Sequence, residues 1–414
     1  MRDLLAPTLL TPQGWADDVR ISVDDAGTIV AVQAAATHAD ARSRGASGTP
    51  QRLPGVVVPG VPNLHSHAFQ RGMAGLAERR AAPGEGFWSW REHMYAFAAR
   101  LAPDDVEAIA TQLYVEMLEA GYTAVAEFHY LHHEAGGRRY ARPGELSDRL
   151  WAAAERAGIG LTLLPVLYRT AGFDGRPLEP AQLRFGSDVD EVGRLLEAAA
   201  ARAAGDGDRA VGLALHSLRA VPPGDIAPAL AAADGIAPGC PVHIHAAEQL
   251  REVEECLAWS GARPVEWLLD HAPLSPRWCL VHATHATAGE LARAAERGVV
   301  IGLCPTTEAN LGDGIFPLRA WLDAGGTLGI GSDSHTSVSP VEELRWLEYV
   351  QRLTRHERAV AAEPAHPSTG RSLLERAWTG GARPPPPRPP RRARAGCVRS
   401  RDGRARRPRR ARGA

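Results

Sequence analysis

Residues 56–70 read VVVPGVPNLHSHAFQ, a run of valines that is closely followed by His65 and His67. Short apolar runs of this kind recur along the chain, and most of them precede a segment with helical periodicity. They predict eight strands: Val56–Val58, Tyr122–Phe128, Gly160–Leu167, Val211–Leu215, Pro241–His245, Trp278–His282, Val299–Leu303 and Thr327–Gly331. Apolar strands that alternate with helices form parallel sheets, and eight such units predict a closed α/β barrel of the (β/α)₈ TIM type over residues 53–380. Spacing alone leaves an open, doubly wound sheet as the alternative.

The clearest helix is predicted over Asp104–Ala120, where apolar residues recur at intervals of three and four. Pro103 lies near its start and Gly121 just after its end, as is usual at helix boundaries. Further helices are predicted over roughly 188–204, 248–260, 286–297 and 340–355.

The two ends of the chain differ from this pattern. Val19–Val23 and Thr28–Val32 flank a short turn and predict a β-hairpin, so residues 1–52 are interpreted as a small, partial β-sandwich. Residues 381–414 contain thirteen arginines, many prolines and one acid, a composition that cannot build a core. The tail is either a basic arm for nucleic acid or the product of a shifted reading frame in a GC-rich gene, and we favour the second interpretation.

The composition of the whole chain excludes several kinds of site. Every one of the 47 basic residues is arginine, which excludes Schiff-base lysines, phosphate-loop lysines and a lysine carbamate bridging two metals. The five cysteines form no CxxC pair and are expected to be reduced thiols. We find neither a signal peptide nor a long apolar run, so we expect a cytoplasmic protein with no membrane partner.

Polar and ionisable residues follow the predicted strands, at the end where barrel enzymes place their catalytic groups. These strand ends read NLHSH (63–67), EFHY (127–130), HSLR (216–219), HIHAAE (243–248), HATH (282–285) and GSDSH (331–335). Because the carboxyl ends of parallel strands meet at one face of a barrel, we expect these side chains to lie near one another.

Four of these residues predict a metal site. His65 and His67 are two apart on a strand, so their imidazoles share a face and can bind one ion. His243 and His245 have the same parity, and we prefer His245 because it is nearer the strand end. Asp333 is too polar for a barrel interior without a partner such as a metal. One divalent ion, with Zn²⁺ expected and Fe²⁺ or Mn²⁺ left open, is predicted at His65, His67, His245 and Asp333.

The motifs PGVPNLHSHAFQ, HIHAAEQ, LVHATH and IGSDSH together resemble the amidohydrolase superfamily, in the branch that binds one metal. More narrowly, FWSWREHMY, EFHYLHH, LHSLRAVPP and CPTTEANLGDGIFP resemble the formimidoylglutamate deiminases of histidine degradation. The resemblance covers about residues 10–380. It implies that a zinc-activated water attacks the amidine carbon of N-formimino-L-glutamate, releasing ammonia and N-formyl-L-glutamate.

The same resemblance implies the roles of the site residues. Glu248 would pass a proton to the leaving ammonia, while His282 and Asp333 would orient the water and take its proton. From its position alone, His282 remains open to a second interpretation, a buried histidine that is hydrogen-bonded to backbone.

Binding of a dicarboxylate substrate is implied for five further residues. Arg219 would grip a carboxylate, and Gln70, Tyr130 and His216 would add hydrogen bonds. Arg91 resembles a residue that in this family reaches a carboxylate across the interface of a homodimer, although a solvated Arg91 fits the sequence as well.

Other residues in these motifs receive no catalytic role. Trp88 and Trp90 are interpreted as packing residues. The segment Cys304–Pro317 is interpreted as a long loop over the site, in which Glu308 and Asn310 brace the loop.

The sequence departs from the family at its C-terminal end, where members return to the N-terminal hairpin and complete a β-sandwich. No matching segment is found, so we expect the hairpin to lack partner strands and the protein to be poorly stable. Two other functions stay open. One is a guanine deaminase-like enzyme of the same superfamily, and the other is a non-catalytic protein that binds nucleic acid through its arginine tail.

Overall fold

The computed structural model describes residues 1–34, 50–78, 86–364 and 367–381. The described residues form two compact units, one up to Gly60 and one from Val61 onward. Apart from Gly381, the predicted tail lies outside the described residues, so the interpretations of the tail stay untested.

The larger unit is a nearly closed barrel of parallel strands, which confirms the predicted fold class. The strands follow the chain around the barrel, and a short ninth strand, β9 (Arg209–Val211), pairs with β8. The eight barrel strands are β6 (Val61–Ser66), β7 (Tyr122–His129), β8 (Gly160–Leu167), β10 (Leu213–Ser217), β11 (Val242–Ala246), β12 (Trp278–His282), β13 (Val300–Leu303) and β14 (Thr327–Ile330).

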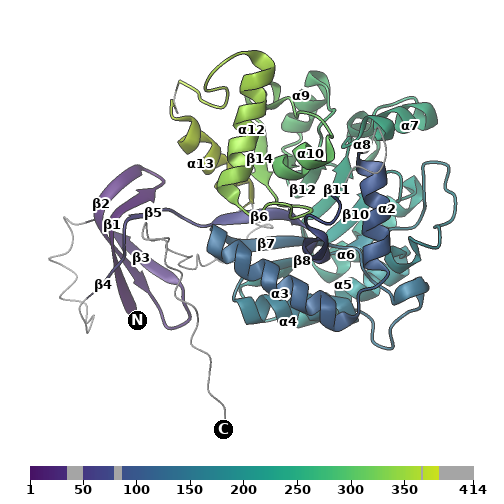
Figure 1. Cartoon of the computed structure of the whole chain (residues 1–414), viewed down its shortest axis with the longest axis horizontal. Coiled ribbons are helices and arrows are strands. Elements are labelled where there is room, and N and C mark those ends of the chain that lie inside the picture. Colours follow the sequence, from purple (N-terminus) through teal and green to yellow (C-terminus); the bar gives the residue numbers. More distant parts are fainter. Residues whose placement is uncertain (35–49, 79–85, 365–366, 382–414) are drawn as a thin grey trace, which may run out of the picture. The chain divides into compact units, whose positions relative to one another are not determined.

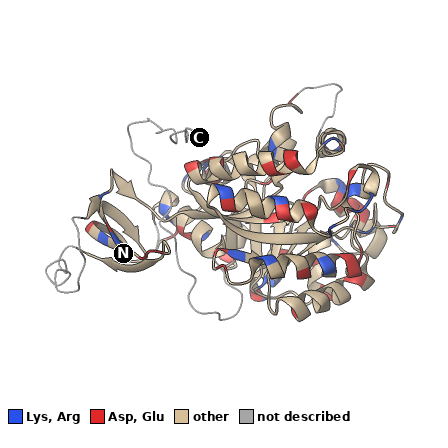
Figure 2. Ribbon diagram, turned by 90° about the horizontal axis from the view of Figure 1, so that it is seen from below, with Lys and Arg blue, Asp and Glu red and all other residues tan. Residues whose placement is uncertain are grey.

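Figure 1 shows helices around the outside of these strands. They are α2 (Phe87–Ala98), α3 (Pro103–Ala120), α4 (Glu145–Ala157), α5 (Val189–Ala203), α6 (Pro223–Ile236), α7 (Leu250–Ser260), α8 (Pro264–His271), α9 (Ala288–Glu296), α10 (Pro305–Leu311), α11 (Leu318–Asp323), α12 (Pro340–Arg355) and α13 (Thr369–Gly381). Short 3₁₀ helices cover Ala68–Met73, Ala135–Gly137 and Leu183–Phe185. The charged residues in Figure 2 lie mainly on this helical layer, as expected for a barrel whose strands are buried on both faces.

Helix α3 illustrates how the sequence sets these elements. Pro103 occupies its first turn, and Gly121 ends it with a φ of +109°, a conformation that glycine adopts without strain. Leu113 and Met117 of its apolar stripe are fully buried. The helix therefore begins and ends within one residue of its predicted bounds.

The barrel closes at the end where the polar residues gather. The N–H of Asp333 donates to the carbonyl of His65 at 3.1 Å, and the N–H of His67 donates to the carbonyl of Asp333 at 3.2 Å. A Cβ atom on Gly331 would lie 2.7 Å from the carbonyl oxygen of His65, so only glycine permits this close approach. Backbone contacts between the first and last strands thus bring three predicted metal ligands together.

The first predicted strand was wrong. Val56–Val57 form β5, which pairs in parallel with β1 (Arg2–Thr11) in the smaller unit, and Val56 is 57% exposed. The first barrel strand is β6, whose Pro62 and Asn63 weakened its apolar signal. The predicted strand at Val211–Leu215 is likewise divided at Gly212 into β9 and β10.

The smaller unit contains the predicted hairpin, formed by β2 (Gly14–Val23) and β3 (Ile29–Gln33). The hairpin also has a partner that was not predicted, because β1 pairs with β2 along its whole length and β4 (Gln51–Arg52) extends the sheet beyond β1. The expected loss of partner strands from the C-terminal end stays a prediction. A small core stabilises this sheet, with buried Leu4, Ala6, Leu9, Val19, Ile21, Val23 and Leu53.

Two predictions from composition can be compared with the described residues. Their four cysteines are free and buried, as expected of reduced thiols. None of their helices has both the length and the apolar character that crossing a membrane requires.

Candidate metal centre and active site

Three predicted ligands converge at the carboxyl end of the barrel. The Nε2 atom of His65 lies 3.1 Å from Nε2 of His67 and 3.0 Å from Nε2 of His245. In a tetrahedral site with metal–nitrogen bonds of about 2.0–2.1 Å, ligand atoms are roughly 3.3 Å apart, so this spacing fits a shared ion. Burial lowers the pKa of all three imidazoles and keeps them neutral, the form that binds metals.

Hydrogen bonds to the opposite ring nitrogens orient two of these ligands. Nδ1 of His67 donates to the carbonyl of Phe128 at 2.9 Å, and Nδ1 of His245 donates to the carbonyl of His216 at 2.9 Å. This leaves each Nε2 as a lone-pair donor facing the centre, the usual arrangement of histidine ligands.

Asp333 joins the same cluster. Its Oδ1 lies 3.4 Å from Nε2 of His65 and 3.2 Å from Nε2 of His67. His65, His282 and Asp333 also form a set whose ligand atoms lie within 4.8 Å of one another. Three imidazoles and one carboxylate fit a divalent ion such as Zn²⁺.

His243, the alternative to His245, is not part of this cluster. It is buried on the same strand, two residues before His245, and its burial lowers its pKa to about 3. Because residues two apart share a face, His243 lies one layer deeper in the barrel. The position nearer the strand end decides which imidazole reaches the centre.

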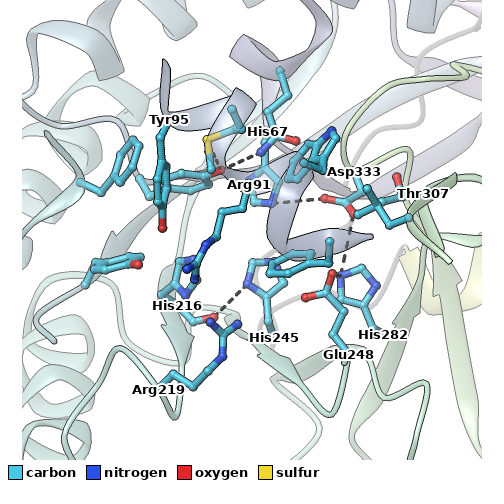
Figure 3. Close-up of a pocket in the computed structure, with 18 residues that line it drawn as sticks. His67, Arg91, Tyr95, His216, Arg219, His245, Glu248, His282, Thr307 and Asp333 are labelled. Carbon is cyan, nitrogen blue, oxygen red and sulfur yellow. Dashed lines mark hydrogen bonds and ion pairs between the residues drawn. The ribbon is translucent and has the colours of Figure 1, made fainter. Parts of the chain in front are cut away.

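Glu248 and His282 lie beside the cluster (Figure 3). Nε2 of His282 is 3.9 Å from Oε1 of Glu248 and 3.8 Å from Oδ2 of Asp333. Burial raises the pKa of Glu248 to about 7, and nearby Asp333 acts in the same direction. For His282, burial lowers the pKa but the surrounding carboxylates, Glu248 first, raise it to about 10. Two proton-exchanging groups therefore flank the place where a metal would bind.

The backbone is strained where these side chains leave their strands. Ala247, His282 and Asp333 have φ values of +50°, +70° and +48°, which residues other than glycine rarely adopt. Such conformations cost about 1–3 kcal/mol each and persist where the surrounding structure over-determines them. They occur at the carboxyl ends of β11, β12 and β14, where the residues of the site lie.

The five residues implied for substrate binding line the same pocket, which also contains the acid–base group. Gln70 donates to the hydroxyl of Tyr130 at 2.7 Å, and the ring of His216 packs between those of Tyr130 and Tyr168. Burial lowers the pKa of His216 well below its usual value, with Arg219 adding to the effect.

Arg91 and Arg219 supply the positive charge of this pocket. Their guanidinium groups lie over the Trp88 ring, at 4.6 and 5.5 Å from its centroid, and Figure 3 shows them close together beside His216. Among the described residues, the Nε atoms of both arginines are buried and have no hydrogen-bond partner. Burial lowers the pKa of Arg219, but the carboxylate of Glu252 raises it, and the net shift is upward. Two cations with unused donors predict an anionic ligand.

Arg91, on helix α2, is half-buried and lines the pocket of its own chain. Its predicted reach across a dimer interface stays a prediction, because the structure contains one chain. Trp88, interpreted as a packing residue, packs against the guanidinium groups of Arg91, Arg219 and Arg251, while Trp90, interpreted in the same way, lines the pocket.

Residues Cys304–Pro317 are not one long loop. Helix α10 occupies Pro305–Leu311, and its Glu308 lies 3.2 Å from Nδ1 of His282. One signal could have indicated this helix, because Pro305 is typical of a first helical position and places Glu308 in the first turn. Asn310 donates to Glu78 and does brace the surface.

Comparisons with known proteins agree with this geometry. The profile of the amidohydrolase family matches residues 56–366. The chain is 53% identical to a formimidoylglutamate deiminase from Pseudomonas aeruginosa, over 92% of this chain and 82% of that protein. It is 30% identical to a 5-methylthioadenosine/S-adenosylhomocysteine deaminase from Natronomonas pharaonis, over 90% of this chain and 77% of that protein. The crystal structure of an amidohydrolase from Brucella melitensis is 48% identical and superposes with a TM-score of 0.85, covering 92% of this chain and 82% of that one.

Proposed function

The chain belongs to the amidohydrolase family, and from that premise we propose that it hydrolyses N-formimino-L-glutamate to N-formyl-L-glutamate and ammonia, as a step of histidine degradation. One observation carries the proposal: a buried pocket has metal ligands and acid–base groups at one side and two arginines at the other. The formimino group is an amidine and the rest of the molecule has two carboxylates, so both parts of the pocket have a counterpart in this substrate.

The metal is proposed to be a single Zn²⁺ ion held by His65, His67, His245 and Asp333. Zinc bound there would act as a Lewis acid and make a water molecule acidic enough to attack near neutral pH. The fit rests on the spacing of the Nε2 atoms and the carboxylate beside them. Iron(II) and manganese(II) accept similar ligands, so metal analysis of the purified protein decides the identity.

The remaining chemistry is assigned to three side chains. Water adds to the amidine carbon and loses a proton to Asp333, while His282 orients the water. Glu248 gives a proton to the substrate nitrogen, and the bond between that nitrogen and the carbon breaks. The hydroxyl proton of the intermediate returns to Glu248 as the formyl group forms, and Asp333 passes its proton to the released ammonia, which leaves as ammonium. A pKa of about 7 suits Glu248 to accept and donate a proton in the same cycle.

The substrate carboxylates are proposed to bind Arg219 and Arg91. Guanidinium groups pair with carboxylates through two parallel hydrogen bonds, and both side chains have free donors in the pocket. Gln70, Tyr130 and His216 line the same side and would complete the hydrogen bonding. A purine pocket would have little use for two neighbouring cations, which favours the dicarboxylate over a nucleobase.

The proposal extends to the state of the protein in the cell. The resemblance to a small-molecule catabolic enzyme supports a cytoplasmic homodimer. Arg91 and Arg219 of the same chain both line this pocket, so each subunit of the proposed dimer would supply its own pair of arginines.

Ammonia release from N-formimino-L-glutamate tests the function. The metal-loaded protein is assayed in parallel with guanine and 5′-methylthioadenosine, and metal content is measured on the same preparation. We expect turnover of the first substrate alone, and its loss in Glu248→Gln with metal retained. Turnover of a purine in preference to N-formimino-L-glutamate would overturn the assignment.

A further inference from the structure

We propose that Glu308 is a positioning residue for His282, an inference that rests on the function proposed above. Glu308 holds one nitrogen of the His282 ring so that the other faces Glu248 and Asp333. Glu308 lies on α10, in a segment that was predicted to be a loop over the site with Glu308 as a brace.

The geometry of the ring carries the proposal. Nδ1 of His282 lies 3.2 Å from Oε1 of Glu308, while Nε2 lies 3.9 Å from Glu248 and 3.8 Å from Asp333. The two nitrogens of an imidazole lie on different edges of a rigid ring, so a hydrogen bond at one of them determines where the other points. With Nδ1–H donating to Glu308, only Nε2 is left to act on the reacting groups.

Glu308 is itself held rigidly. Its Oε1 accepts a hydrogen bond from the N–H of Cys304 at 2.9 Å, and its own N–H donates to the carbonyl of Cys304 at 2.9 Å. Helix α10 is also held from outside, because Glu343 of α12 accepts hydrogen bonds from the N–H of Thr306 at 2.9 Å and from the Thr306 hydroxyl at 2.6 Å. A carboxylate fixed by its own helix can hold a ring in one orientation at little cost in entropy.

Stability alone gives a weak reason for this arrangement. Glu308 is only 5% exposed, and taking a carboxylate out of water costs more than a pair of hydrogen bonds returns in many proteins. His282 adds a strained φ of +70° at the end of β12. Buried charge and backbone strain at the same contact are typical of a site that is built for chemistry.

Both donors reach the same oxygen atom, and this makes glutamine an informative substitution. In Glu308→Gln, the N–H of Cys304 selects the amide oxygen for that position, so the bond from His282 is kept while the negative charge is lost. Glu308→Ala removes both bonds. Glu343→Gln is the matched control, because it perturbs a buried glutamate that contacts α10 but not His282.

The experiment measures kcat and KM for N-formimino-L-glutamate, metal content, Tm and the crystal structure of each variant. In Glu308→Ala we expect kcat to fall by about 10- to 100-fold with KM and metal content nearly unchanged, and the His282 ring to leave its position. Glu308→Gln should keep the ring in place and recover most of the lost kcat, while Glu343→Gln should lower Tm and keep kcat.

Three results would overturn the proposal: an unchanged kcat in Glu308→Ala, an equal loss of kcat in both Glu308 variants, or an unmoved His282 ring in the alanine variant. Failure of the proposed function is recognised separately. In that case the unsubstituted, metal-loaded protein does not release ammonia from N-formimino-L-glutamate, and the ring position in the two crystal structures still decides the role of Glu308.

Discussion

Replacing Arg219 by methionine should abolish most of the activity by removing the grip on one carboxylate. The side chain is 7% exposed and lines the pocket beside His216, with its Nε buried and unpaired among the described residues. Methionine has a similar length and fills the space with apolar atoms. The change therefore removes charge and donors while retaining much of the packing.

The size of the effect follows from the bonds lost. A hydrogen bond to a charged group contributes about 1.5–3 kcal/mol, and a bidentate contact has two, so the loss is roughly 3–6 kcal/mol. This corresponds to a fall of about 10²- to 10⁴-fold in kcat/KM.

A second consequence concerns stability. Burial raises the pKa of the fully buried Glu252, and the charge of Arg219 acts in the opposite direction. Arg219→Met leaves this carboxyl group without its cation, so the single variant should also have a lower Tm. The variant Arg219→Met with Glu252→Gln removes this unpaired charge. The amide oxygen of the glutamine can still accept the hydrogen bond that Glu252 receives from the N–H of Glu248. The double variant therefore separates a loss of substrate binding from a loss of folded protein.

The assay compares three substrates in a thermodynamic cycle. N-formimino-L-glutamate has both carboxylates, N-formimino-4-aminobutyrate lacks the one on the α carbon, and N-formimino-2-aminobutyrate lacks the one on the side chain. The analogue without the carboxylate that Arg219 binds should react equally slowly with the unsubstituted protein and with Arg219→Met. The other analogue should show the full penalty of the substitution. A penalty of the same size on all three substrates would refute a carboxylate contact for Arg219.

Three more predictions concern the metal site and its support. Burial raises the pKa of Glu127 from 4.5 to about 8. Between these pH values the folded protein keeps a proton on Glu127 that the unfolded chain has lost. The free energy of unfolding therefore falls as pH rises, by up to about 1.4 kcal/mol per pH unit. Glu127→Gln should flatten this slope in denaturant titrations at pH 5 and pH 8, and an unchanged slope would contradict the assignment. His245→Ala should lose the metal while His243→Leu keeps it, as measured by elemental analysis; equal metal contents would count against the placement of His245. Gly331→Ala puts a Cβ 2.7 Å from the backbone of His65, so chelator competition should show metal binding weakened by about tenfold or more, and unaltered affinity would mean that the loop yields without cost.

The barrel could be read from local patterns because each strand and helix has its own periodicity. The bounds of β8 and β12 were predicted to the residue, and those of α12 as well. Where the pattern was ambiguous, as at Val56–Val57, an apolar run could join either of two sheets, and nothing local distinguishes them. Strand β1 of the smaller unit was missed although it is ten residues long, because its alternation is interrupted by Pro7.

The identity of the candidate metal ligands also followed from the sequence, and the reason is topological. In a parallel barrel the carboxyl ends of all strands meet at one face, so residues just after strands gather without any knowledge of the distances between them. The sequence therefore predicts that His65, His67, His245 and Asp333 lie in one place. It could not choose firmly between His243 and His245, because parity gives the face of a strand but not the depth along it.

Only the tertiary structure decided how the side chains meet. Strand periodicity says nothing about the contact of Glu308 with His282, or about two arginines sharing the face of Trp88, because these partners come from different elements and touch through side-chain rotamers. Sequence determined which chemical groups stand at the mouth of the barrel, since that depends on periods of two and 3.6 residues. Their mutual distances, and hence their pKa values and their aim, depend on how the helices pack against the strands, which no local period contains.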